Sequence, residues 1–246
     1  EDKAESDNLL DILVQTQKFI DFTESKSPLA FKMSAIRKHA EIIPLPNLKY
    51  RFEEEETFIS MVAEDFVLNY PFRKDRAPDL HSYSREEVPL FLQWDPAWGY
   101  KKYGSDFLAV TGCGPTCLAM VGWYLTGDDA MTPDAMANFA QKGGYYEKGY
   151  GSSWTLISKG GPELGLEVKE LPLVKKKMTD ALEAGNPVIL ALGKGDFTSS
   201  GHYIVLTGVE EEGYRVNDPN SRVNSGRLWS YEELEGQIRN IWAISK

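Results

Sequence analysis

The chain has 246 residues, which is enough to form one or two domains around a hydrophobic core. Hydrophobic residues make up 42% of the chain and charged residues 26%, and both fractions are ordinary for a soluble globular protein. The formal net charge of −10 argues against a nucleic-acid-binding protein, which needs a basic face, and no run approaches the ~20 apolar residues that cross a bilayer.

Residues 1–85 are predicted to be a helical extension of unknown role. Apolar residues between positions 9 and 20 follow the three-and-four spacing of an amphipathic helix, and a second helix is predicted over residues 31–42. We interpret the extension as extra helices packed on the core. A prodomain-like cover and an adaptor are the open alternatives.

The sequence changes from polar to apolar near residue 86, where a second domain is predicted to begin and to extend to residue 246. Residues 71–87 are polar and contain proline, which is typical of a linker. Residues 88–93 form a short apolar run that predicts a strand, and an aromatic, glycine-rich loop follows over residues 94–103.

Two cysteines lie four residues apart where a helix is predicted to begin. Cys113 is flanked by Gly112 and Gly114, and Cys117 opens an apolar run that is long enough for a buried helix. Cysteines on consecutive helical turns fit poorly with the ~3.8 Å Cβ separation of a disulfide, and two cysteines without a nearby histidine cannot form a zinc site. We therefore expect no disulfide, metal or cofactor, and we expect one cysteine to be reactive.

Further helices and strands complete an α+β pattern, in which helices come first and mainly antiparallel strands follow. Helices are predicted from cap and proline signals at residues 133–142, 153–164 (broken by glycines), 175–184 and after Ser230, which forms a capping box with Glu233. Strands are predicted at residues 187–192, 202–209, 214–217 and 241–244.

Cys113 is the better candidate nucleophile of the two cysteines. The reactive form is the thiolate, and the positive end of a helix dipole or a nearby imidazolium stabilises it. Glycines on both sides allow a substrate carbonyl to approach the backbone. Cys117 lies one turn deeper and is expected to be an inert buried thiol. The alternative for Cys113 itself is a small core residue at a helix start.

His202 is the best placed of the three histidines to act as a base. His39 lies in a charged helical stretch and His81 in the polar linker, whereas His202 opens a hydrophobic strand. Asp218 ends the next strand, so an antiparallel pair would bring the two side by side, and the carboxylate would fix the imidazole tautomer. Asn217 is the alternative orienting residue, but its side chain should point to the opposite face.

These segments together resemble the C39-like peptidases, a branch of the papain-like superfamily. The resemblance covers roughly residues 88–246 and is carried by Gln93, by Gly112-Cys113-Gly114-Pro115-Thr116 opening a helix, by Gly201-His202-Tyr203 opening a strand and by Asn217-Asp218-Pro219 ending the next. The interval from histidine to aspartate, 218 − 202 = 16 residues, also suits the family.

The resemblance implies a papain-like cysteine peptidase fold, in which a helical part packs on a mainly antiparallel sheet. It implies a thiol hydrolase in which Cys113 attacks a carbonyl, His202 acts as base and then as acid, and Asp218 holds His202. Gln93 would donate its amide to the oxyanion beside the Cys113 N–H. Substrate-binding candidates are Trp94, Trp98, Gly112, Trp154 and Gly201. Local packing is the alternative for the aromatic residues.

The resemblance is stronger to one group of family members than to another. In members that trim double-glycine leaders the glutamine lies only a few residues before the cysteine, whereas here the interval is 113 − 93 = 20 residues. Stand-alone bacterial members are more similar, and many of those are exported. Because the chain begins at Glu1 and shows no signal-peptide core, we expect a trimmed, exported protein, extracellular or associated with the cell envelope.

Three functions are compatible with these residues. The first is a cysteine peptidase or amidase that acts on a peptide or protein substrate, with a monomer favoured. The second is an acyl transferase of transglutaminase type that uses the same triad. The third is a peptide-binding module that kept the fold without turnover.

Overall fold

The computed structural model describes residues 80–246 except residues 96, 100, 149 and 199, and the predicted helices of the N-terminal extension lie outside these residues. The elements are listed in chain order: η1 (Leu80–Ser82), β1 (Lys102–Tyr103), β2 (Asp106–Phe107), α4 (Leu108–Thr111), α5 (Cys113–Thr126), α6 (Pro133–Lys142), β3 (Tyr146–Glu147), β4 (Gly151–Ser152), η2 (Leu156–Gly160), α7 (Gly161–Glu163), β5 (Glu167–Glu170), α8 (Lys175–Glu183), β6 (Val188–Gly193), β7 (Gly201–Glu210), β8 (Gly213–Asn217), α9 (Arg222–Ser225), β9 (Leu228–Trp229), α10 (Tyr231–Glu235) and β10 (Ile238–Ser245).

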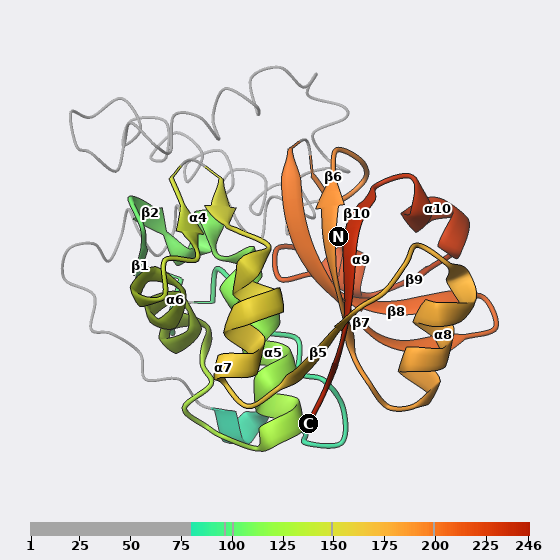
Figure 1. The fold of residues 1–246 in the computed structure, drawn as a ribbon, viewed down its shortest axis with the longest axis horizontal. Coiled ribbons are helices and arrows are strands. Elements are labelled where there is room, and N and C mark those ends of the chain that lie inside the picture. Colours follow the sequence, from blue (N-terminus) through green and yellow to red (C-terminus); the bar gives the residue numbers. More distant parts are fainter. Residues whose placement is uncertain (1–79, 96, 100, 149, 199) are drawn as a thin grey trace, which may run out of the picture. The chain divides into compact units, whose positions relative to one another are not determined.

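A six-stranded antiparallel sheet forms the centre of the described region, with the strand order β5-β10-β6-β7-β8-β9. Helices α4 to α7 lie on one side of it and α8 and α10 on the other (Figure 1). The α+β prediction of helices packed on a mainly antiparallel sheet is therefore confirmed for the described residues.

The three central strands have apolar side chains on both faces, which explains their continuous apolar runs in the sequence. In β6, Ile189 and Ala191 belong to the core shared with α5, whereas Val188 and Leu190 belong to the core shared with α8. Alternate residues point to opposite faces of a strand, so one run supplies both cores.

Local signals set the ends of several elements. The Thr132 side chain accepts a hydrogen bond from the Ala135 N–H at the start of α6, as the cap signal predicts. Ser230 and Glu233 form the predicted capping box of α10. Gly185 follows α8 with φ +80°, a left-handed conformation that glycine adopts without strain.

The strand prediction for residues 88–93 is wrong, because this segment pairs with no strand in the described region. The carbonyl groups of Val88 and Pro89 instead accept hydrogen bonds from the Asn217 side-chain amide, both at 3.0 Å. The apolar side chains of the segment still enter the core, since Phe91 is fully buried.

The end of the predicted linker also packs against the domain. Leu80 is buried, and Arg85 Nη2 lies 2.6 Å from Asp129 Oδ1, with its guanidinium over the Trp123 ring. The helix predicted over residues 153–164 is divided into the π-helical turn η2 and the short α7. None of the described helices has the length and apolar character that a membrane crossing requires.

Candidate active site

Cys113 is the first residue of α5 and is half-buried. The short helix α4 precedes it, and Gly112 joins the two with φ −88° and ψ 14°. A Cβ on Gly114 would lie 2.5 Å from Ser152 Oγ and 2.7 Å from Ser152 Cβ, so β4 packs directly on the start of α5. The positive end of the α5 dipole therefore lies at the Cys113 thiol.

Cys117 lies one turn further along α5 and is fully buried, as predicted. Burial, with the nearby charges of Cys113 and Asp218, raises the pKa of the Cys117 thiol well above its usual value. Both cysteines are free thiols. Of the two, Cys113 is the one that solvent and a ligand can reach.

His202 and Asp218 contact each other through a short hydrogen bond, with 2.7 Å between His202 Nε2 and Asp218 Oδ1. Strand pairing explains the contact. Val205 pairs with Asn217, and continuing this register places Asp218 opposite Ile204. His202 lies two residues away on the same face of β7, within reach of the carboxylate.

The His202 ring is held in its protonated form by its neighbours. Burial lowers the pKa of the ring, but the Asp218 carboxylate and the hydrogen-bonded Cys113 sulfur outweigh it and raise the pKa to about 10. His202 is thus in contact with both other members of the candidate triad. Since Nε2 is hydrogen-bonded to Asp218, the other ring nitrogen, Nδ1, is the one available to exchange a proton with Cys113.

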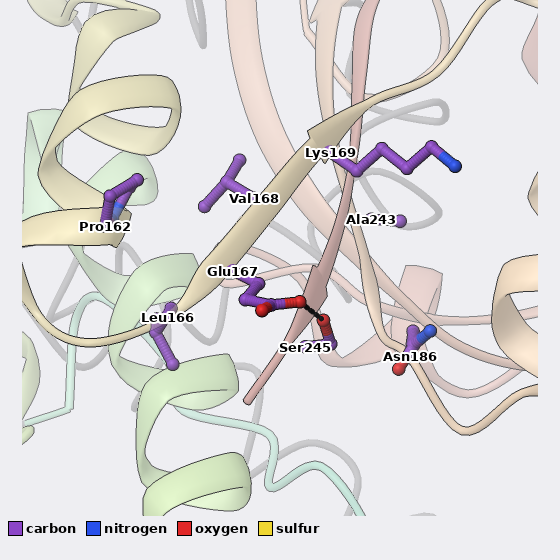
Figure 2. Close-up of a pocket in the computed structure, with 8 residues that line it drawn as sticks. All are labelled: Pro162, Leu166, Glu167, Val168, Lys169, Asn186, Ala243 and Ser245. Carbon is purple, nitrogen blue, oxygen red and sulfur yellow. Dashed lines mark hydrogen bonds between the residues drawn. The ribbon is translucent and has the colours of Figure 1, made fainter.

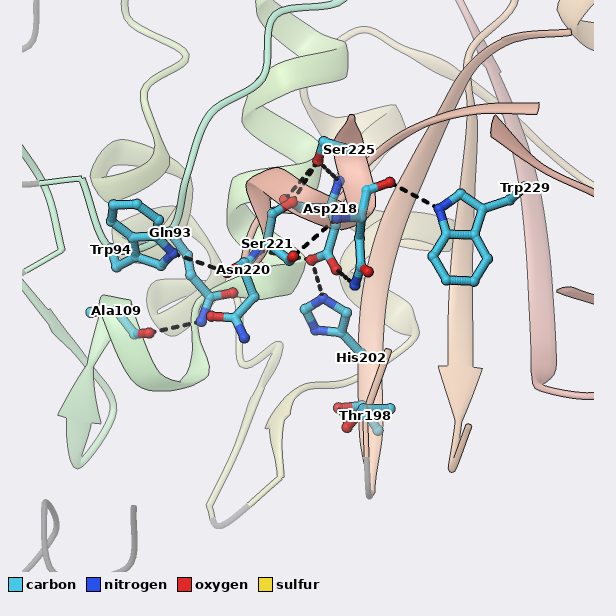
Figure 3. A network of polar contacts seen from close by, with 12 residues as sticks. Gln93, Trp94, Ala109, Thr198, His202, Asp218, Asn220, Ser221, Ser225 and Trp229 are labelled. Atoms are coloured by element: carbon cyan, nitrogen blue, oxygen red, sulfur yellow. Dashed lines mark hydrogen bonds and ion pairs between the residues drawn. The ribbon is translucent and has the colours of Figure 1, made fainter. Parts of the chain in front are cut away.

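Asp218 is buried and accepts hydrogen bonds on both carboxylate oxygens (Figure 3). Oδ1 accepts from His202 and from the Asn220 N–H at 2.8 Å, and Oδ2 accepts from Asn224 Nδ2 at 2.8 Å. Asn224 is a residue that sequence reasoning missed. Asn217 points away from this cluster and binds the 88–89 segment, as its strand position predicts.

Gln93 lies between the Asp218 turn and the helical turn that precedes Cys113. Its backbone N–H donates to the Pro219 carbonyl at 2.7 Å, and its Nε2 donates to the Ala109 carbonyl at 2.8 Å. The side chain is buried, and its Oε1 has no hydrogen-bond partner within the described residues. One of its two amide hydrogens is used by Ala109, which leaves the other for a second acceptor.

A cavity of about 440 Å³ opens beside Cys113 and His202. Of the five substrate-binding candidates, Trp154 and Gly201 line it, and Trp154 is 49% exposed. Its lining residues are Cys113, Glu147, Tyr150, Ser152, Ser153, Trp154, Thr155, Ala191, Leu192, Gly201, His202 and Tyr203. The described residues thus form a cleft with the candidate nucleophile and base at its wall.

The other three candidates lie elsewhere. Trp98 is in the core against Phe91, and Trp94 is buried with its Nε1 donating to the Asn220 carbonyl at 3.1 Å. Gly112 contributes its backbone conformation to the start of α5 and does not line the cavity. For Trp94 and Trp98 the alternative interpretation of the aromatic loop holds, because both side chains are packed inside the domain.

A second cavity of about 490 Å³ lies beside the edge strand β5 and the end of β10 (Figure 2). Its lining includes Glu167, which accepts a hydrogen bond from Ser245, and Lys169. No cysteine or histidine lines it. This cavity therefore lacks the cysteine and histidine that line the cleft at Cys113.

Comparisons with known proteins show the family of the chain. The model of the Peptidase_C39 like family matches residues 85–246. The peptidase domain of Streptococcus ComA, described as a bi-functional ABC transporter involved in quorum sensing, is 20% identical (TM-score 0.43; 56% of this chain and 93% of that chain covered). A structure described as a C39-like peptidase from Bacillus anthracis is 17% identical (TM-score 0.39; 65% and 95% covered). No curated protein matches the chain in sequence.

Proposed function

Because the chain belongs to the Peptidase_C39 like family, we propose that it is a cysteine peptidase that cleaves a peptide or amide bond with Cys113 as the nucleophile. The observation that carries the proposal is the position of His202, which is hydrogen-bonded to the Asp218 carboxylate and lines the same cleft as Cys113. An imidazolium beside a sulfur favours the reactive thiolate, so the pair is suited to attack on a carbonyl.

The reaction proceeds in two steps. The Cys113 thiolate adds to the substrate carbonyl, and the tetrahedral intermediate collapses to a thioester as His202 gives its proton to the leaving amine. Water, deprotonated by His202, then attacks the thioester and releases Cys113. Asp218 keeps the ring oriented in both steps through the 2.7 Å contact.

A peptide library tests the proposal. Incubation of the library with the protein is expected to give new amino and carboxyl termini, identified by mass spectrometry. Addition of a primary amine distinguishes hydrolysis from the acyl-transfer alternative, because a transferase would divert products into amides. A complete absence of Cys113-dependent products would favour the peptide-binding module.

Gln93 is proposed to donate its free amide hydrogen to the oxyanion. We expect Gln93→Ala to lower kcat/KM by ~10²–10³-fold, the usual cost of one oxyanion donor. Alkylation of Cys113 by iodoacetamide forms no oxyanion, so its rate in Gln93→Ala should equal that of the wild type. This measurement is the control for a displacement of α4, because the Gln93 side chain also binds the Ala109 carbonyl. Equal losses in both reactions would rule out this role for Gln93.

The cleft is proposed to favour a cationic side chain near the scissile bond. Glu147 is the one acidic residue among the described residues that line it, and no lysine or arginine is among them. The exposed rings of Tyr150 and Trp154 provide surface for an aliphatic stem.

We expect Glu147→Gln to reduce the preference for lysine over glutamine in the substrate by about 1.4- to 5-fold, because a solvent-exposed ion pair contributes ~0.2–1 kcal/mol. Profiling of the same library checks the result. Glu167→Gln, an exposed glutamate of β5 outside the cleft, is the matched control. An unchanged preference in Glu147→Gln would show that Glu147 does not select the substrate.

A further inference from the structure

We propose that Asn224 is a positioning residue that fixes the Asp218 carboxylate for its contact with His202. This inference rests on the proposed function. Within the described residues, the Asn224 amide is the side chain that binds Asp218 Oδ2, with Nδ2 at 2.8 Å. His202 and the Asn220 N–H bind Oδ1 (Figure 3). A carboxylate is planar, so a donor that holds one oxygen also sets the direction of the other.

Asn224 is itself held in place by two contacts to its backbone. Its N–H donates to Ser221 Oγ at 3.1 Å, and its carbonyl accepts from Trp229 Nε1 at 2.9 Å. Trp229 is buried and packs against Phe197 with ring centroids 4.2 Å apart and the ring planes tilted by 38°. The backbone that carries the amide is therefore anchored to the core, and the amide has a defined direction.

A neutral amide suits this position better than a charged group would. It satisfies Oδ2 with a hydrogen bond, and it leaves the full negative charge of the carboxylate available to His202. A cation at the same place would compete with the imidazolium for that charge. A serine would be too short to reach Oδ2 from the same backbone position, so the length of asparagine also matters.

A double-mutant cycle tests whether Asn224 acts through Asp218. We expect Asn224→Ala to lower kcat/KM by about 10-fold, because the Asp218 carboxylate loses the hydrogen bond that holds its Oδ2. In the Asp218→Ala background the same substitution should change kcat/KM by less than about 2-fold. Asn240→Ala is the matched control, since the Asn240 side chain accepts a hydrogen bond from the N–H of its neighbour Ile241 in β10 and has none with Asp218 among the described residues.

Equal effects of Asn224→Ala in both backgrounds would overturn the inference, because a structural role would not depend on Asp218. If Asn224→Ala does not fold, Asn224→Ser gives the same comparison. Failure of the proposed function looks different: the wild type itself would then show no Cys113-dependent turnover, and no cycle would be measurable.

The pH profile of Asn224→Asp provides a second readout. At low pH the introduced carboxyl is protonated and can donate to Oδ2, and at higher pH it ionises and repels Asp218. Other charged groups nearby are His202, Arg222 of α9 and Arg227, whose guanidinium lies over the Trp229 ring. Activity relative to wild type should fall as the pH rises from about 4 to about 8. For Asn224→Ala, which introduces no carboxyl, the activity relative to wild type should not change with pH. The same constant relative activity in Asn224→Asp would contradict the inference.

Discussion

Cys113→Ala is expected to abolish cleavage of every peptide that the wild-type protein cleaves, with turnover reduced by about 10⁴-fold or more. The reason is that no other nucleophile is available in the described cleft with a base at hand: His202 contacts Cys113, and the deeper thiol of Cys117 is fully buried. Library profiling of the two proteins under identical conditions measures the effect.

Cys117→Ala is the matched control for this experiment. It removes the other thiol of α5, which lies in the core, so it should cost some stability and leave the cleavage products unchanged. A Cys113→Ala protein that retains the wild-type products would exclude Cys113 as the nucleophile. Loss of products in Cys117→Ala with an intact fold would show that the reaction depends on Cys117, and the assignment of Cys113 as the nucleophile would then be wrong.

Asp218→Ala is expected to have the second largest effect, both on turnover and on stability. Without the carboxylate the imidazole loses its orientation and its tautomer, which typically costs about 10⁴-fold in kcat. The variant also leaves the buried His202 ring without its partner, and removal of one member of a buried pair costs ~3–5 kcal/mol.

The stability loss should depend on pH in a defined direction. The pKa of His202 is raised from 6.5 to about 10 in the folded protein, where burial opposes the rise and Asp218 and Cys113 cause it. A raised folded-state pKa stabilises the fold fully below about pH 6.5, and this contribution disappears as the pH rises through about 10.

Urea unfolding at about pH 6 and about pH 10 measures this dependence. The difference in unfolding free energy between wild type and Asp218→Ala should be large at the lower pH and smaller at the higher pH. Asp180→Ala is the control, because Asp180 is an acid in an i,i+4 surface pair with Lys176 and should cost less than about 0.5 kcal/mol. A difference that does not change with pH would show that Asp218 does not stabilise the imidazolium.

Much of the catalytic domain could be predicted from local patterns. Apolar runs separated by glycine-bearing turns indicated β6, β7 and β8, and antiparallel pairing then placed His202 beside Asp218. The cap at Thr132 and the capping box at Ser230 located two helix starts. These features depend on residues near one another in sequence, and short-range patterns record such contacts well.

The failures concern contacts between residues far apart in sequence. Residues 88–93 have the composition of a strand, but the carbonyl groups of Val88 and Pro89 accept hydrogen bonds from Asn217, which lies 129 residues from Val88. Strand β5 carries only one apolar residue, Val168, and was not predicted, since its place is set by pairing with β10. Trp98 belongs to the core, and the composition of an aromatic loop does not distinguish a core residue from a cleft residue.

Asn224 illustrates the same limit within the site. It lies six residues after Asp218, in the polar stretch 217–225 that reads as a turn. Its role depends on the direction in which the short helix α9 returns after that turn, which the contact with Trp229 fixes. Ser221 is a local signal for the start of α9, because serine is a favoured N-cap residue and its side chain accepts from the Asn224 N–H.

The most direct test of the central claim is the rate at which iodoacetamide alkylates each cysteine near neutral pH, measured by peptide mapping. Cys113 lies at the wall of the cleft beside His202, whereas burial protects Cys117. We predict that Cys113 reacts much faster than Cys117 and that His202→Ala slows Cys113 without changing Cys117. A Cys113 that reacts no faster than Cys117, or that is unaffected by His202→Ala, would contradict the assignment of a nucleophile activated by His202.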